Sequence, residues 1–165
     1  MELSRSLLPE PTQSPKERSG VDPAVCVAAG LSLLAAGVHL WVAPGHAVQW
    51  PGYGAFLFAV ALLQGTLAAL LLRGPSPSVA LAGVPVNLLA VGVYLVTRTY
   101  GLPFGPHAGR TEEAGALDLV AVAAELGVVA VLVASLGGRA RRWAVNGLLA
   151  LGVALWILRL TGATG

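Results

Sequence analysis

The sequence predicts an all-α integral membrane protein, a bundle of five transmembrane helices in which four form the core and the last is peripheral. Hydrophobic residues make up 56% of the 165 residues and charged residues only 11%, whereas soluble domains are about a quarter charged. Five apolar runs follow one another, each close to the roughly 20 residues that cross a bilayer. One such run also fits a buried helix of a soluble protein, but five in a chain of this length favour the membrane. The runs lie at about 23–43, 53–72, 78–97, 114–136 and 143–160.

The chain divides into two parts. Residues 1–21 mix acids and bases with Pro and Ser and develop no apolar stretch, a composition typical of disordered segments. We therefore predict a disordered cytoplasmic tail over 1–21 and a five-helix transmembrane domain over 22–162.

Turn-forming residues separate the apolar runs. Pro and Gly mark a first loop over 44–52, a second over 74–77 and a fourth at 137–138. The third loop is longer, covers 100–110 and leads to Thr111, which two glutamates follow. Threonine is a favoured helix N-cap and acids are favoured in a first turn, so we expect Thr111 to cap the next helix.

Basic residues are unevenly distributed between the predicted loops. Successive helices alternate in direction, so the tail, the second loop and the fourth loop share one side of the membrane. That side carries Arg5, Lys16, Arg18, Arg73, Arg139, Arg141 and Arg142. The other side carries Arg98, Arg110 and Arg159. Because basic loops stay in the cytoplasm, we expect a multi-pass protein of the cell membrane, with its N-terminus cytoplasmic and its C-terminus outside.

Polar residues recur at helical spacing in four of the runs. Positions seven or eleven apart return to nearly the same helix face, so each run carries one polar stripe. In chain order the stripes are Ser32 and His39; Tyr53 and Gln64; Asn87, Tyr94 and Arg98; Asp118 and Glu125. At about 1.5 Å per residue, these residues fall into a deep layer near the midplane and a shallower layer toward the outer side. The deep layer consists of Ser32, Gln64, Asn87 and Glu125.

The stripes predict a polar pocket that opens to the outer side. Its expected ligand-binding residues are His39, Gln64, Asn87, Tyr94, Arg98, Asp118 and Glu125. A carboxylate at the midplane is costly, so Glu125 should face the bundle and be paired or protonated. For the deep layer a second interpretation is equally good: its residues form a hydrogen-bond network that only fixes how the helices pack. For Arg98 we expect the side chain to reach the interface and pair with Asp118 or a loop acid.

The histidines suggest a metal site at the outer end. Imidazole and carboxylate groups there would suit zinc, copper or iron, so a transition metal is the candidate cofactor. The candidate ligands are His39, His46, His107 and Asp118, with Glu112 or Glu113 completing the set. No two of these histidines have the spacing of a helical metal motif, and a loop histidine is more often solvated or bonded to the backbone.

Other classes of function have less support. Most arginines lie at the ends of apolar runs, so the net charge of +2 does not indicate nucleic-acid binding. Cys26 is the only cysteine, which rules out a disulfide framework and a paired redox motif within the chain. No spacing supports a Ser/His/Asp triad, a nucleophilic cysteine or paired carboxylates, so an enzyme is the least supported class.

Several segments resemble a group of small multi-pass membrane proteins of high-GC, mostly actinobacterial, bacteria. The segments are 39–46 (HLWVAPGH), 50–54 (WPGYG), 94–107 (YLVTRTYGLPFGPH), Asp118-Leu119 and Glu125-Leu126. The resemblance covers the first four apolar runs. It implies a membrane location; the activity of the group is uncharacterised, so it implies no catalytic residue.

Three functions follow from these patterns. The favoured one is an outward-facing pocket that binds a metal ion, a cofactor or a small polar ligand. The alternatives are a structural or accessory subunit of a membrane complex, in which the stripes only pack, and a proton-coupled carrier of small solutes with Glu125 as the protonatable group. The expected partners are the lipid bilayer and either further copies of the chain or a larger membrane complex.

Overall fold

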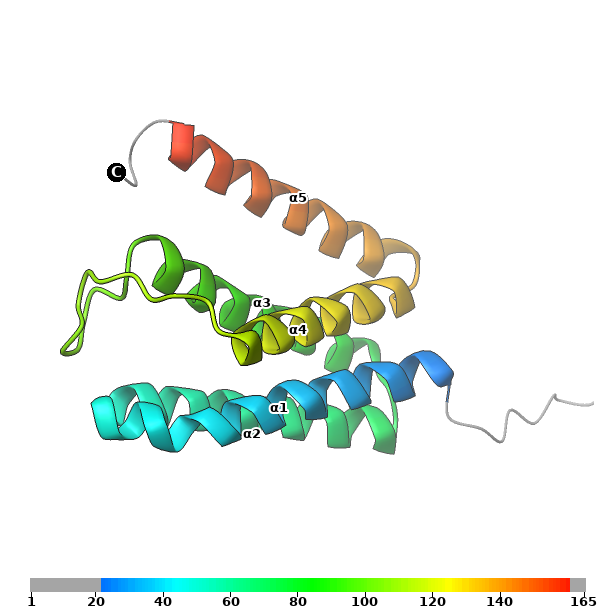
Figure 1. Ribbon diagram of the computed structural model, residues 1–165. Helices are drawn as coiled ribbons and strands as arrows, with labels where there is room; N and C mark the ends of the chain where they lie inside the picture. The colour runs from blue at the N-terminus through cyan, green and yellow to red at the C-terminus, as the bar shows by residue number, and fades with distance from the viewer. Residues whose placement is uncertain (1–21, 161–165) are drawn as a thin grey trace, which may run out of the picture.

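The computed structural model describes residues 22–160, which form five α-helices and, within that range, no strand (Figure 1). The helices are α1 (Pro23–Gln49), α2 (Pro51–Arg73), α3 (Pro77–Thr99), α4 (Ala116–Ser135) and α5 (Gly138–Leu160). The predicted tail over 1–21 lies outside the described residues, so its disorder stays a prediction.

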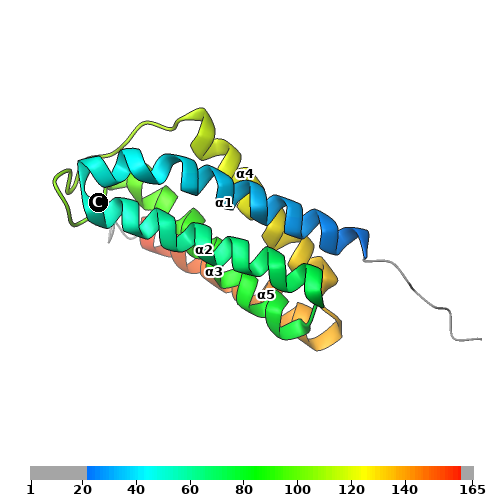
Figure 2. The same ribbon diagram turned by 90° about the horizontal axis from the view of Figure 1, so that it is seen from below.

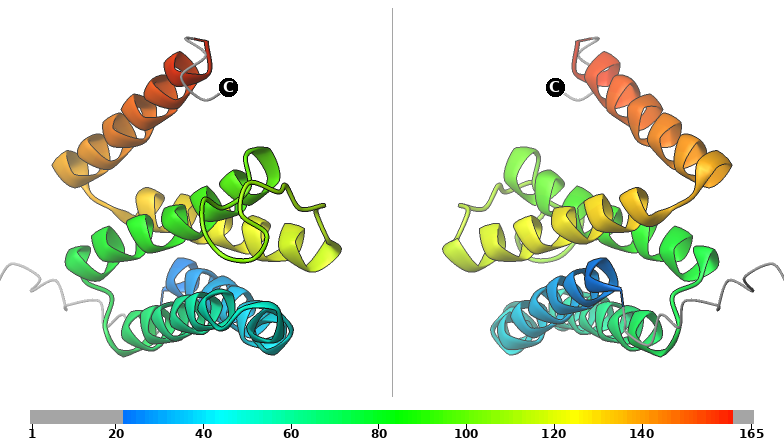
Figure 3. Two further views of the ribbon diagram at one scale, coloured as in Figure 1. Left: turned by 90° about the vertical axis from the view of Figure 1, so that its left-hand side faces the viewer. Right: turned by 90° about the vertical axis from the view of Figure 1, so that its right-hand side faces the viewer.

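The first four helices form a bundle of two layers. Helices α1 and α2 make one antiparallel hairpin, α3 and α4 make the other, and the hairpins lie against each other (Figures 1 and 3). Seen from below, α1 and α2 lie side by side (Figure 2). We call the end of the bundle with Trp50 and residues 100–115 the loop end, and the end with residues 74–76 the opposite end.

An apolar cluster fills the bundle near the opposite end. A Cβ atom on Gly83 would collide with Leu67 and Leu132, so this glycine lets α3 pack closely against α2 and α4. The buried members of the cluster are Val25, Ala28, Ala29, Leu67, Ala68, Leu71, Ala80, Val84, Val128, Val129, Leu132, Val133 and Leu136. No polar side chain belongs to this buried set, so the polar stripes meet elsewhere in the bundle.

Local sequence explains where three helices begin. Helices α1, α2 and α3 start at Pro23, Pro51 and Pro77, and proline suits the first helical position because its missing N–H is not needed there. The side chain of Asp22 accepts a hydrogen bond from the amide of Ala24 at 3.0 Å, which caps α1.

Helix α1 runs past the first predicted loop. It continues through Pro44 to Gln49, so the prediction that His46 lies in a loop is wrong. Proline removes one helical hydrogen bond, but the last turns of α1 are held against α2. A Cβ atom on Gly54 would collide with the side chain of Ala47 and the backbone at Ala43. This close contact between α1 and α2 favours helix over turn.

Helix α4 begins later than predicted. It starts at Ala116, so Thr111 is not its N-cap. Instead the amide of Gly115 donates to Asp118 Oδ2 at 2.9 Å, while the amide of Glu112 donates to the carbonyl of Thr97 at 3.0 Å. The segment after Thr111 is therefore bound to the end of α3 as extended chain.

Helices α1 to α4 are each long and apolar enough to cross a membrane, with 27, 23, 23 and 20 residues. Helix α5 joins the bundle at the opposite end, where Ala140, Ala144 and Leu148 pack against the apolar cluster. Beyond that contact it diverges from α4 (Figure 3), in agreement with a peripheral position. Several of its side chains lie outside the described residues, so its crossing of a membrane stays a prediction.

Candidate functional site

Four fully buried polar side chains form a hydrogen-bond network inside the bundle. Ser32, Gln64 and Asn87 are 0% exposed, and Glu125 is 1% exposed. Gln64 Nε2 donates to Glu125 Oε1 at 2.9 Å and to Asn87 Oδ1 at 3.5 Å. Ser32 Oγ donates to the main-chain carbonyl of Gln64 at 2.7 Å. The deep layer expected from helical spacing is thus present, with one residue from each of α1 to α4.

The network determines which nitrogen of His39 carries a proton. Asn87 Nδ2 donates to the carbonyl of Gly83 at 2.8 Å, so Asn87 Oδ1 faces Gln64 Nε2. Gln64 Oε1 therefore faces His39 Nδ1, at 3.0 Å. Because an amide oxygen can only accept hydrogen bonds, His39 Nδ1 is the donor.

His39 and Glu125 form a close pair of ionisable groups that a single shared proton would leave without net charge. His39 Nε2 lies 3.7 Å from Glu125 Oε1. With that proton the pair is either a neutral imidazole beside a protonated carboxyl group or an imidazolium beside a carboxylate, and neither form carries a net charge. Removing the shared proton would leave a buried negative charge, which costs free energy unless another cation replaces it.

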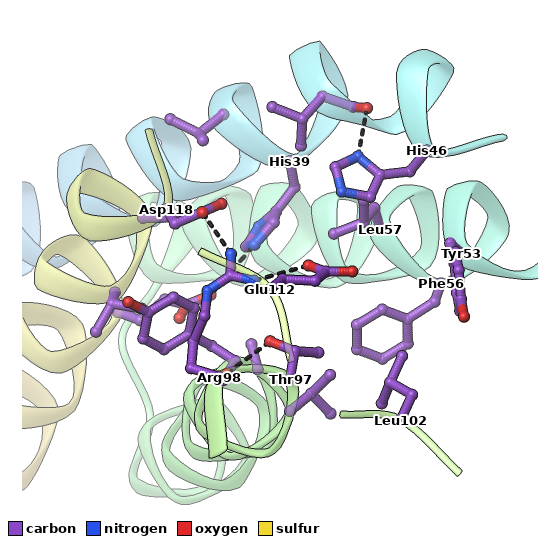
Figure 4. Close-up of a pocket in the computed structure, with 18 of the residues that line it drawn as sticks. His39, His46, Tyr53, Phe56, Leu57, Thr97, Arg98, Leu102, Glu112 and Asp118 are labelled. Atoms are coloured by element: carbon purple, nitrogen blue, oxygen red, sulfur yellow. Dashed lines mark hydrogen bonds and ion pairs between the residues drawn. The ribbon is translucent and has the colours of Figure 1, made fainter. Parts of the chain in front are cut away.

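Arg98 lies at the loop end between two carboxylates (Figure 4). Its Nη1 donates to Glu112 Oε2 at 2.7 Å, and its Nη2 donates to Asp118 Oδ2 at 2.5 Å. Its guanidinium carbon lies 5.1 Å from the centre of the Tyr94 ring, a cation–π contact. The structure thus contains the predicted pairing of Arg98 with Asp118 and a loop acid.

The loop over 100–115 is attached to α2. The hydroxyl of Tyr53 donates to the carbonyl of Phe104 at 3.0 Å. The Trp50 ring contacts both aromatic neighbours, with centroids 5.0 Å from Tyr53 and 6.1 Å from Phe104. Gly105 has a φ of +87°, and a Cβ atom there would collide with the Tyr53 hydroxyl. Glycine at this position lets the loop lie against the end of the bundle.

A cavity of about 190 Å³ lies between the buried network and the loop. His39 and Glu125 line it from the side of the network, and Arg98, Glu112 and Asp118 line it from the loop end. Its other walls are mostly apolar and include Val38, Val42, Phe56, Leu57, Val93 and Leu102. The site is therefore a largely apolar pocket that ionisable side chains also line, among them His39, Arg98, Glu112 and Asp118 (Figure 4).

The structure divides the predicted pocket residues into two groups. Five line the cavity: His39, Tyr94, Arg98, Asp118 and Glu125. Gln64 and Asn87 do not line it, although both were expected to bind the ligand directly. They lie behind the wall, where they hold Glu125 and His39 in place.

The predicted metal site has no support in the described residues. They contain no group of three or more His, Cys, Asp or Glu side chains that could hold a metal ion. His39 is bonded to Gln64 and Asp118 to Arg98. His46 Nδ1 bonds the carbonyl of Val42 at 3.0 Å, and His107 is an exposed loop residue. His46 lies on α1, which extends past Pro44, and it lines a hollow at the loop end together with His107 and Glu112.

The apolar walls of the cavity were missed from the sequence. Most wall residues nevertheless lie three or four positions from a residue of a polar stripe. Val42 follows His39 by three residues, and Phe56 and Leu57 follow Tyr53 by three and four. Residues at these spacings share a helix face, so the polar stripes already indicated their apolar neighbours.

Comparisons of the chain with protein-family models, curated proteins and solved structures found no match.

Proposed function

We propose that this chain is an integral membrane protein. The outer surface of the bundle is apolar on every helix, whereas its polar side chains are internal. Leu33, Leu62, Leu89 and Leu119, one from each of α1 to α4, are between 52% and 61% exposed. Exposing this apolar surface to water would be unfavourable. A bilayer would solvate the surface, and the network of Gln64 and Glu125 would stay inside the bundle.

The basic residues support one orientation of the bundle. Arg73, Arg139, Arg141 and Arg142 lie at the opposite end, and the loop end carries Arg98 and Arg110. Of the two loop-end arginines, Arg98 is neutralised by Glu112 and Asp118. The positive-inside rule therefore supports a cytoplasmic opposite end and a loop end that faces out of the cell.

We further propose that the bundle binds a small molecule in the cavity over Glu125. The cavity itself carries this proposal. It measures about 190 Å³, larger than the roughly 150 Å³ apolar cavity that takes up benzene in an engineered protein. Its walls combine many apolar side chains with a few ionisable ones such as His39 and Glu125, the composition typical of ligand pockets.

The chemistry of the walls indicates the form of the ligand. Phe56, Leu57 and Val93 offer contact to an apolar body. His39 and Glu125 offer hydrogen bonds to a polar group at one end of it. The proposal is therefore a molecule about the size of one six-membered ring, with a single polar head.

A cavity-filling variant tests this proposal. Benzyl alcohol, benzylamine and benzoate are titrated into the detergent-solubilised full-length protein, and the shift in its unfolding temperature is measured. A ligand at 100 times its Kd stabilises the folded state by about 2.7 kcal/mol. We expect at least one probe to stabilise the protein, and Val93→Phe, which narrows the cavity, to abolish the shift.

The matched control is Leu89→Phe, one turn away on α3 and 61% exposed on the outside. It should bind the probe as the unmodified protein does. An equal loss of the probe-induced temperature shift in both variants would contradict a binding cavity. So would the absence of stabilisation by any of the three probes.

The carrier alternative has less support from this conformation. The buried apolar cluster lies between the network and the opposite end, and its members include Leu71, Val128 and Leu132. These apolar side chains separate the network from the opposite end in this conformation. We therefore favour binding over transport.

A further inference from the structure

The charges around the cavity indicate which polar head the ligand carries, an inference that depends on the binding cavity proposed above. Arg98 is already paired with Glu112 and Asp118, so these three residues together contribute a formal charge of −1. His39 and Glu125 add nothing while they share their proton. Without that proton the ionisable groups of the cavity wall would carry a formal charge of −2. An anionic ligand would add to this negative charge, and Arg98, the nearest cation, is engaged by both carboxylates.

The hydrogen-bonding atoms at the inner end favour a donor. Once the shared proton is gone, Glu125 is a carboxylate and accepts only. His39 Nδ1 is committed as a donor to Gln64, so His39 Nε2 is then an acceptor too. These two acceptors, Nε2 and Glu125 Oε1, are 3.7 Å apart. A primary ammonium group has three N–H donors and can donate to both.

Exchanging the shared proton for an ammonium ion also conserves the charge of the cavity. A monovalent ammonium ion that enters while the shared proton leaves keeps the total charge of the cavity at −1. Adding a cation or removing a proton alone would change the charge buried between the helices, which costs free energy. The paired exchange avoids that cost.

We propose that the cavity binds a primary ammonium ion with an apolar body of about one six-membered ring, and that binding releases the proton shared by His39 and Glu125. The ammonium group lies at His39 Nε2 and Glu125. The apolar body lies among Phe56, Leu57 and Val93. Each ammonium ion bound displaces one proton to solvent, and the covalent structures of ligand and protein are unchanged.

Other ionisable groups face the same cavity and enter the interpretation of any pH dependence. From α1 these are His39 and His46; from α2, Tyr53; from α3, Tyr94 and Arg98; from the loop, Glu112; and from α4, Asp118 and Glu125. Arg98, Glu112 and Asp118 are held as ion pairs, and His46 Nδ1 bonds the carbonyl of Val42. The shared pair is therefore the group on which we expect ammonium binding to act.

The test measures benzylammonium and benzyl alcohol binding to the detergent-solubilised full-length protein by titration calorimetry. The two probes have similar apolar bodies and differ in the charge of the head. Between about pH 6 and 8 an alkylammonium ion keeps its charge, so a pH effect reports on the protein. We expect benzylammonium affinity to rise with pH, by about tenfold per pH unit wherever the unbound pair keeps its proton, since one proton is then released. Titrations in two buffers of different ionisation enthalpy should count that proton directly.

The variant Glu125→Gln keeps the shape of the side chain and removes its charge. It should weaken benzylammonium binding at least tenfold and weaken benzyl alcohol binding much less, because the uncharged hydroxyl group can still bond the amide of the glutamine. The control is Glu113→Gln, which removes a negative charge from an exposed residue that does not line the cavity. It should change neither affinity by more than about twofold, since exposed charges are screened by salt.

Three results would overturn the inference. Equal affinities for benzylammonium and benzyl alcohol would show a cavity without charge preference, which leaves the proposed function intact. Benzylammonium binding without proton release or pH dependence would remove the role of the shared pair, a result that stands even if Glu125→Gln fails to fold. Failure of both probes to bind would remove the ammonium site along with the cavity function.

Discussion

At the scale of single residues, Gln64 is the centre of the site although it does not touch the cavity. Its side chain contacts His39, Asn87 and Glu125, which come from three other helices. Its main-chain carbonyl also accepts the hydroxyl of Ser32. A residue with this many buried partners stabilises the bundle and sets the proton positions at the same time.

Replacing Gln64 with Leu should therefore destabilise the protein strongly. The substitution removes the amide that His39, Asn87 and Glu125 contact, and each buried polar group left without a partner costs about 1–3 kcal/mol. We expect the free energy of unfolding, measured in detergent by denaturant titration, to fall by at least the cost of one such group, about 1–3 kcal/mol.

The comparison for this prediction is Ser32→Ala. It deletes one hydrogen bond, to the carbonyl of Gln64, and should cost about 1 kcal/mol. If Gln64→Leu were no more costly than Ser32→Ala, Gln64 would not be the centre of the network.

At the scale of elements, the loop over 100–115 is shaped by glycines with positive φ. Gly101, Gly105 and Gly109 have φ values of +73°, +87° and +72°, which L residues with a side chain rarely adopt. The loop carries Leu102, Phe104 and Glu112 to the cavity. Its backbone conformation therefore decides how the cavity is covered at the loop end.

Gly105 and Gly109 offer a matched pair of substitutions. An alanine at Gly109 meets open space and adds only backbone strain, whereas an alanine at Gly105 adds the same strain and also collides with the Tyr53 hydroxyl. We expect Gly105→Ala to release the loop from α2 and Gly109→Ala to leave it attached. Limited trypsin cleavage after the exposed Arg110 should then be faster in Gly105→Ala.

Similar cleavage rates in the two variants would argue against the contact of the loop with Tyr53. Adding Tyr53→Phe to Gly105→Ala provides a further check. It removes the hydroxyl that the new methyl group would meet and also the hydrogen bond to Phe104, so the loop should remain released.

At the scale of the whole molecule, two helical hairpins close around one polar site. Glu125 on α4 reaches Gln64 on α2, and His39 on α1 reaches both. The apolar cluster holds the hairpins together at the opposite end, and the cavity lies toward the loop end. The proposed orientation places that cavity near the outer surface of the cell.

Cysteine labelling tests this orientation. The single native cysteine, Cys26, is exposed, so it is first replaced by serine. In that background we introduce Ala108→Cys at the loop end or Pro75→Cys at the opposite end. A membrane-impermeant maleimide should label Ala108→Cys in intact cells and Pro75→Cys only after permeabilisation. The reverse pattern would contradict the positive-inside argument.

Helical periodicity by itself determined much of this protein. The apolar runs predicted helices close to α1 to α4, and helical periodicity grouped Ser32, Gln64, Asn87 and Glu125 into one layer. The physical reason is that the pitch of a helix is fixed by its backbone. Polar residues at that period must therefore face one direction, and burial inside an apolar bundle makes them face one another.

Only the tertiary structure decided what those residues do. Contact with Gly54 keeps α1 helical past Pro44, and the attachment of Glu112 to α3 delays the start of α4 until Ala116. Packing also placed Gln64 and Asn87 behind the cavity wall and left His39 and Glu125 on it. Neighbours from other helices set these outcomes, because hydrogen-bond partners and close contacts between helices depend on how the hairpins pack and not on the order of residues within one helix.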